Sequence, residues 1–173
     1  MEKSFLNQKD APRGIRNNNP GNLIKTSIKW RGKIPHDKNK DARFEQFENI
    51  SWGIRAMAMD ILNDIKKGKN TLRDLITEYA PPSENDTAAY IKLVSDQTKI
   101  SPDAIIKPTP EILSAIVAAK IRVENGKAAS KFIDANDIKE GIKKISSKFA
   151  AAVKAGAVFL PFLLLGLFLI MNK

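Results

Sequence analysis

The chain has 173 residues, a formal net charge of +10 and no cysteine. Its length suits one domain of ordinary size with an additional segment, and the lack of cysteine excludes disulfide bonds and thiolate metal sites. His36 is the only histidine and lies in a polar stretch, so a histidine-rich metal site is excluded too. No metal or cofactor is therefore expected.

The first part of the chain is rich in turn residues. Residues 1–12 are polar and are predicted to form a flexible arm. They are followed by RGIRNNNPGNL at 13–23, in which three asparagines precede a proline and a glycine. Apolar and polar residues then alternate at 23–30 and again at 42–47, and this alternation predicts a small β-hairpin.

Helices are predicted for most of the rest of the chain. Each prediction combines a capping residue in front with a helix-breaking residue behind. The capping residues are Ser51 before 52–67, Thr71 before 72–79, Ser83 before 84–98, and Thr109 with Pro110 before 111–124. The fold class predicted for residues 13–132 is therefore mainly α (α+β).

The C-terminal region predicts a membrane anchor. Residues 155–171 carry no charge, and with the small apolar residues before them they are long enough to cross a hydrocarbon core. Five lysines precede this run between 139 and 154. We therefore predict a basic linker helix at 133–148 and a transmembrane helix at 149–173, with the domain on the side where the chain is made.

Glu124 is the first candidate for a catalytic residue. It ends the predicted helix 111–124, at the edge of an apolar face formed by Ile112, Ile116, Ala119 and Val123. Partial removal from water favours the protonated form of a carboxyl group, and a protonated glutamate is what a general acid needs to cleave a glycosidic bond. The alternative is a solvated glutamate at a helix end.

Glu84 is the second candidate. It follows a pair of prolines, in a stretch bounded by Tyr79 and Tyr90. The alternative is an acidic residue in the first turn of a helix, where it complements the helix dipole.

Side-chain amides and aromatic rings suggest how a sugar could be held. Amides offer both donors and acceptors to saccharide hydroxyl and N-acetyl groups, and an indole ring can stack on a sugar face. The predicted substrate-binding residues are Asn17, Asn18, Asn19, Asn22, Trp30 and Tyr90. The alternatives are a tight turn for the asparagines and a core position for Trp30.

Several separated motifs occur in order between residues 13 and 127: RGIRNNNPGNL, WRG, FEQF, SWGIRAMA, LRDLITEYAPPSENDTAAYI and AAKIRVENG. Together they resemble a family of phage virion-associated lytic transglycosylase-like proteins. The resemblance implies a lysozyme-like, peptidoglycan-cleaving domain in which one glutamate acts first as acid and then as base, without a metal.

The order of the motifs departs from that superfamily, in which the helix bearing the acid usually comes before the asparagine-rich and aromatic motifs. We hypothesise a circular permutation that places Glu124 at the usual acid position, with Asn125 where serine is common. Glu84 remains a competitor for the same role.

The resemblance and the predicted anchor together imply a membrane-anchored virion protein that degrades peptidoglycan when a phage enters or leaves its host. The expected location is the internal membrane of a virion, and the expected partners are peptidoglycan glycan strands, lipid membrane and capsid or vertex proteins. The alternative is a non-catalytic structural membrane or vertex protein of a membrane-containing phage. Specific nucleic-acid binding is not expected, because the basic residues are dispersed and form no known nucleic-acid motif.

Overall fold

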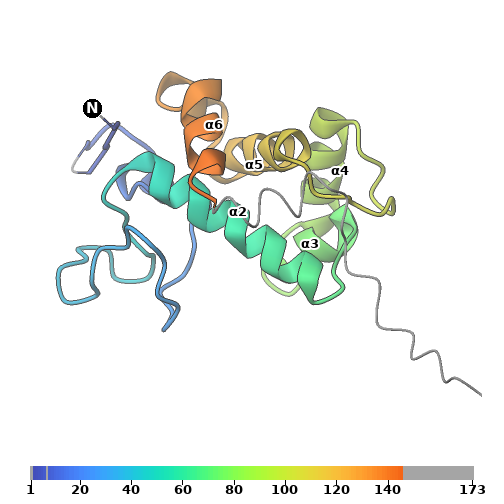
Figure 1. The fold of residues 1–173 in the computed structure, drawn as a ribbon, viewed down its shortest axis with the longest axis horizontal. Coiled ribbons are helices and arrows are strands. Elements are labelled where there is room, and N and C mark those ends of the chain that lie inside the picture. The colour runs from blue at the N-terminus through green and yellow to red at the C-terminus, as the bar shows by residue number, and fades with distance from the viewer. Residues whose placement is uncertain (1, 7, 146–173) are drawn as a thin grey trace, which may run out of the picture.

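The computed structural model describes residues 2–6 and 8–145. This part of the chain folds into helices joined by irregular segments (Figure 1). The helices are α1 (Arg13–Arg16), α2 (Ile50–Lys66), α3 (Leu72–Tyr79), α4 (Thr87–Thr98), α5 (Pro110–Asn125), the 3-10 helix η1 (Lys127–Lys131) and α6 (Ala135–Lys143).

Side-chain caps set where these helices begin. Thr71 and Thr109 accept hydrogen bonds from the first turns of α3 and α5, at the predicted positions. The helix α2 begins two residues earlier than predicted because Asn49, not Ser51, caps it. The helix α4 begins three residues later than predicted because Asp86, not Ser83, caps it, which leaves Glu84 in the preceding loop.

The long helix α2 organises the core. It packs against α6, α5 and α3, while α5 also packs against α4 and α1 (Figure 1). The buried apolar side chains of α2 and α5 meet in one cluster, which includes Ile54, Met57, Ile61, Ile116 and Val117. Burial of this surface is the main stabilising contribution to the fold, and it fixes α5 so that its C-terminal end reaches the segment after α1.

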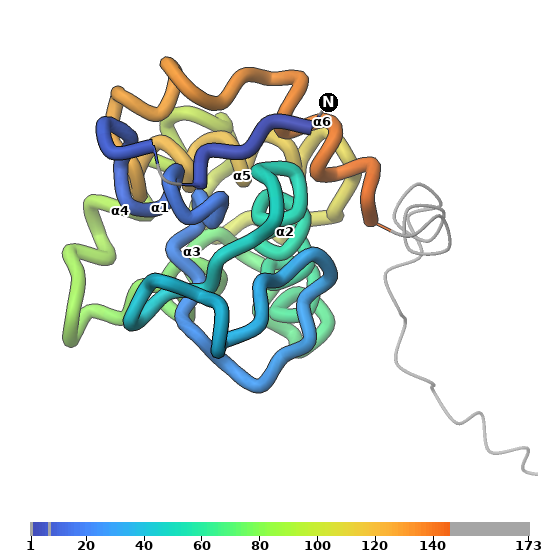
Figure 2. The backbone as a smooth tube through the Cα atoms, turned by 90° about the vertical axis from the view of Figure 1, so that its left-hand side faces the viewer, coloured from blue at the N-terminus to red at the C-terminus, as the bar shows by residue number. Residues whose placement is uncertain are grey.

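The N-terminal segment lies beside α6 (Figure 2). The Lys3 ammonium forms ion pairs with Asp134 at 2.8 Å and Asp137 at 2.7 Å. The Phe5 ring packs edge-on against Phe132, with ring centroids 5.7 Å apart. These contacts hold residues 2–6 against the C-terminal part of the described chain.

The predicted fold class is wrong about the β-hairpin. The runs 23–30 and 42–47 share one isolated antiparallel bridge, Ile24–Phe44, and a second bridge, Lys33–Phe47, joins 42–47 to the segment after the first run. Side chains take the place of a regular ladder here: Asp41 accepts hydrogen bonds from the backbone N–H groups of Arg43 and Phe44. Backbone groups that are satisfied in this way do not need a strand partner.

The membrane prediction is also corrected. No helix in the described part of the chain is long and apolar enough to cross a membrane, so the predicted single-pass membrane location is wrong as far as the structure extends. The segment predicted as the anchor, 149–173, lies outside the described residues. The described part of the predicted linker 133–148 contains α6, which packs against α2 and α5.

Candidate functional site

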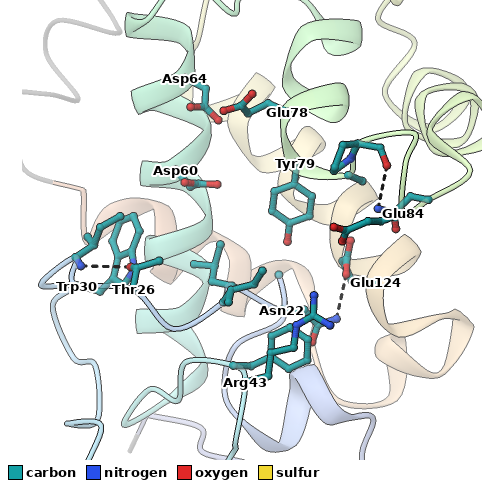
Figure 3. Close-up of a pocket in the computed structure, with 18 of the residues that line it drawn as sticks. Asn22, Thr26, Trp30, Arg43, Asp60, Asp64, Glu78, Tyr79, Glu84 and Glu124 are labelled. Atoms are coloured by element: carbon teal, nitrogen blue, oxygen red, sulfur yellow. Dashed lines mark hydrogen bonds between the residues drawn. The ribbon is translucent and has the colours of Figure 1, made fainter.

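A pocket of about 550 Å³ opens between the irregular segment 21–30 and the helices α2, α3 and α5 (Figure 3). Its lining combines exposed apolar and aromatic side chains with carboxyl groups. The residues that matter for the argument are Ile24, Trp30, Phe44, Asp60, Glu84 and Glu124. Such a mixture is typical of a ligand-binding cleft, in which apolar walls provide contact and a few polar groups fix orientation.

Glu124 enters this pocket from the last turn of α5. The fully buried side chains of the helix include Leu113, Ile116, Val117 and Lys120, and Glu124 continues this stripe one turn after Lys120. The buried face therefore differs from the predicted one, because Ile112 and Val123 are only partly buried. Glu124 itself is partly buried.

Both carboxyl oxygens of Glu124 accept hydrogen bonds. Asn22 donates from Nδ2 to Oε2 at 3.0 Å (Figure 3). Tyr90 donates its hydroxyl to Oε1 at 2.9 Å. Burial, and then the nearby charge of Glu124, raise the pKa of Tyr90, so its hydroxyl keeps its proton. Three parts of the chain thus contribute one side chain each to a single cluster: the segment that follows α1, the helix α4 and the helix α5.

A glycine allows this close arrangement. A Cβ atom on Gly14 would lie 2.8 Å from the Oδ1 atom of Asn22 and 2.5 Å from that of Asn125. Asn125 in turn donates from Nδ2 to the backbone oxygen of Pro20 at 2.7 Å. Because position 14 carries no side chain, α1 can approach the end of α5 closely enough for Asn22 to reach Glu124.

The side chains of Asn18 and Asn19 bond inside the protein and do not line the pocket. Asn19 donates to the backbone oxygens of Leu23 and Glu45, both at 2.9 Å, and accepts from the N–H of Leu23. Asn18 has a left-handed backbone with φ of 51°, and it donates to the backbone oxygen of Phe47 at 3.0 Å. Both residues are fully buried.

Asn17 is likewise engaged within the fold. It donates to Asp41 at 2.7 Å and accepts from Gln46 at 2.9 Å. The bidentate contact of Arg13 with Asp41 is the main cause that holds the pKa of Asp41 well below its usual value. Of the four asparagines predicted to bind sugar, the structure places only Asn22 in the lining of the pocket.

Of the other predicted residues, Trp30 and Glu84 line the pocket and Tyr90 does not. Trp30 is partly exposed and lines it, and Glu84 is exposed in the loop before α4 and lines it too (Figure 3). The hydrogen bond from Tyr90 to Glu124 suits a residue that orients the carboxyl group. His36 lies at the other end of the irregular segment, where its Nε2 is 3.0 Å from a carboxyl oxygen of the buried Glu45.

Sequence analysis missed two residues that line the pocket, Asp60 and Tyr79, and a buried lysine, Lys120, that contacts Tyr79. Asp60 on α2 lines the pocket, and burial is the largest cause of its raised pKa. Tyr79 ends α3, with a buried hydroxyl that has no hydrogen-bond partner among the described residues. Lys120 is only 1% exposed. The one visible sign in the sequence is a lysine inside the apolar run AIVAAKIRV, where a buried charge is exceptional.

Comparison with known proteins places the chain among bacteriophage proteins. No protein-family model matches the sequence. The chain is similar to Protein P5 of Pseudoalteromonas phage PM2, with 36% identity over 121 residues, which cover 68% of this chain and 73% of that protein. The chain belongs to the family of this phage protein.

Proposed function

We propose that the protein cleaves the glycan strand of peptidoglycan, with Glu124 as general acid and base. The observation that carries this proposal is the position of the Glu124 carboxyl group, which lines a 550 Å³ pocket and is oriented by Asn22 and Tyr90. A carboxyl group held in a fixed direction at a cleft with aromatic walls suits acid catalysis of sugar transfer.

The two hydrogen bonds fit both stages of such a reaction. An amide N–H only donates, so Asn22 keeps the proton of the acid off Oε2. A hydroxyl group can donate or accept, so Tyr90 can contact Oε1 whether or not that oxygen carries the proton. Glu124 would give its proton to the leaving glycosidic oxygen and then take one from a hydroxyl of the sugar itself, which closes an anhydro ring without water.

Aromatic residues on the irregular segment suit the binding of a sugar chain. Trp30 and Phe44 line the pocket opposite the helices, and Ile24 on the same side is 52% exposed. Aromatic rings provide a large contact area for little loss of side-chain entropy. Glu84 faces the same pocket from a loop without a comparable pair of hydrogen bonds, so we assign the acid role to Glu124.

The test is digestion of purified peptidoglycan by the full chain and by two matched variants. We expect soluble fragments with anhydro ends, identified by mass spectrometry. Glu124→Gln should lower the rate by about 100-fold or more, because general acid catalysis contributes at least that factor, whereas Glu84→Gln should stay close to wild type. Full activity of Glu124→Gln would refute the assignment of Glu124 and, with it, the permutation hypothesis.

A second candidate is a non-catalytic component of a phage particle that contacts capsid or vertex proteins. The family membership favours it, since the relative is a phage protein whose name states no activity. The digestion assay separates the two candidates: no release of fragments by the wild-type protein at any pH would favour this structural role.

A further inference from the structure

A group of positive charges surrounds the indole ring of Trp52, in the first turn of α2 and outside the lining of the pocket. The guanidinium carbon of Arg31 lies 5.3 Å from the centroid of this ring, and the ammonium nitrogen of Lys144 lies 4.2 Å from it. Both are cation–π contacts. Because both distances end on the same ring, the two charges lie no farther apart than the sum of these distances.

Arg55, one turn further along α2, adds a third cation. Its Nε atom donates to the backbone oxygen of Lys144 at 3.0 Å, so its guanidinium group lies next to the end of α6. Its two terminal nitrogens have no hydrogen-bond partner in the part of the chain that the structure describes. Burial is the main cause that lowers the pKa of Arg55, and the nearby charge of Arg31 lowers it further.

Carboxyl groups do not balance these charges. Lys144 forms an ion pair with Glu2, but within residues 2–6 and 8–145 neither Arg31 nor Arg55 forms one. The first turn of α2 contains no acidic residue. Glu48 is exposed just before α2, and its carboxyl group pairs with no cation of the described chain. The cluster therefore carries an excess of positive charge.

The backbone holds these cations close together. A Cβ atom on Gly32 would lie 2.2 Å from the Trp52 ring, so the segment that carries Arg31 is pressed against the ring. The backbone oxygen of Gly32 accepts from the N–H of Glu48 at 2.9 Å, and α6 packs along α2. Three distant parts of the chain thus bring one cation each to the start of α2, where the positive end of the helix dipole also favours an anion.

The chemistry of the three groups points to one kind of anion. Guanidinium groups offer several N–H donors in a planar fork that matches the oxygens of a phosphate group. A phosphate has more acceptor oxygens than a carboxylate and, as a monoester, nearly twice its charge at neutral pH. It can therefore contact three cations at once.

We propose that Arg31, Arg55 and Lys144 form a binding site for a phosphate group at the start of α2. The site lies outside the pocket, and the inference does not rest on the proposed cleavage of glycan. Two sources carry this chemistry: a free phosphate or phosphate monoester, and a phosphodiester.

Trp52 itself reports on the site. The chain has two tryptophans, so in the full-length Trp30→Phe variant all indole emission comes from Trp52. We expect a saturable change in this emission on titration with inorganic phosphate at constant ionic strength, and none with chloride. Dimethyl phosphate is the second probe. Tighter binding of inorganic phosphate would identify the monoester type of ligand, and tighter binding of dimethyl phosphate would identify the phosphodiester.

Two matched variants test which residues bind. Arg31→Gln should weaken the binding of the better probe about tenfold, as expected for the loss of one hydrogen bond between charged groups. The Arg31 side chain is exposed and forms no hydrogen bond within the described chain, so this variant should fold, which circular dichroism checks. Arg122→Gln removes an exposed charge at the end of α5 and should bind as wild type does. Isothermal titration calorimetry measures both, because Arg31 contacts the reporter ring.

Two results would overturn the inference. The first is the lack of a saturable response to either probe. The second is equal weakening in Arg31→Gln and Arg122→Gln, which would show only the general attraction of an anion to a basic chain. Neither result bears on the digestion of peptidoglycan, so the proposed function is tested separately.

Discussion

Replacement of Asn19 by alanine should cost about 3 kcal/mol of unfolding free energy. The fully buried amide makes three hydrogen bonds, to the backbone oxygens of Leu23 and Glu45 and from the N–H of Leu23. The variant leaves these backbone groups buried with fewer partners. A lost hydrogen bond costs about 1 kcal/mol, and more where a buried group stays unsatisfied.

Urea unfolding followed by circular dichroism measures this loss directly. Asn85→Ala is the control, because the Asn85 amide is exposed and its contact with the Pro81 oxygen is 3.4 Å long, and it should change the free energy by less than about 0.5 kcal/mol. A loss below about 1 kcal/mol for Asn19→Ala, or losses of equal size in the two variants, would show that the amides do not stabilise the turn.

Three further predictions concern stability. Gly53→Ala should destabilise the protein by about 1–3 kcal/mol in the same assay, although alanine favours helix, because its Cβ would lie 1.8 Å from the backbone oxygen of Asn18. Arg13 is the main cause of the lowered pKa of Asp41, so the folded protein favours the ionised carboxylate and loses stability as the pH falls below about 4. Thermal melts of Asp41→Asn should show a smaller loss of stability in acid. The lowered pKa of Lys120 has the opposite effect, because the unfolded chain holds this proton up to about pH 10 and the folded chain only up to about pH 8. Stability should therefore rise between pH 8 and 10, by up to about 3 kcal/mol, and Lys120→Met should not show this rise. A flat melting temperature over that range in the wild type would contradict this reading of Lys120.

Local chemistry made the helices predictable. Thr71 and Thr109 cap α3 and α5 through bonds within one turn, so a short stretch of sequence contains all the information needed. The end of α5 at Asn125 was predictable for the same reason, since Gly126 follows with a φ of 67°. These features placed Glu124 at the end of a helix before its surroundings were known.

Contacts between distant parts of the chain were not predictable in this way. The runs 23–30 and 42–47 alternate as strands do, but side chains such as Asp41 satisfy the backbone instead. Lys120 is buried, at 1% exposure, because other elements pack around α5, and its ammonium group lies on the Tyr79 ring of α3. Burial of a charge depends on which elements pack together, and no local pattern in the sequence specifies that.

The asparagine-rich turn and the candidate acid form one structural unit. Asn22 and Glu124 are 102 positions apart and yet share a hydrogen bond of 3.0 Å. That bond requires a rigid turn, because Asn22 has a left-handed backbone with φ of 49° and a flexible segment would lose entropy on holding it. The internal bonds of Asn18 and Asn19 provide this rigidity. Loss of either amide should therefore weaken the orientation of Glu124 without any direct contact with it, and this is how a buried turn can influence chemistry in the pocket.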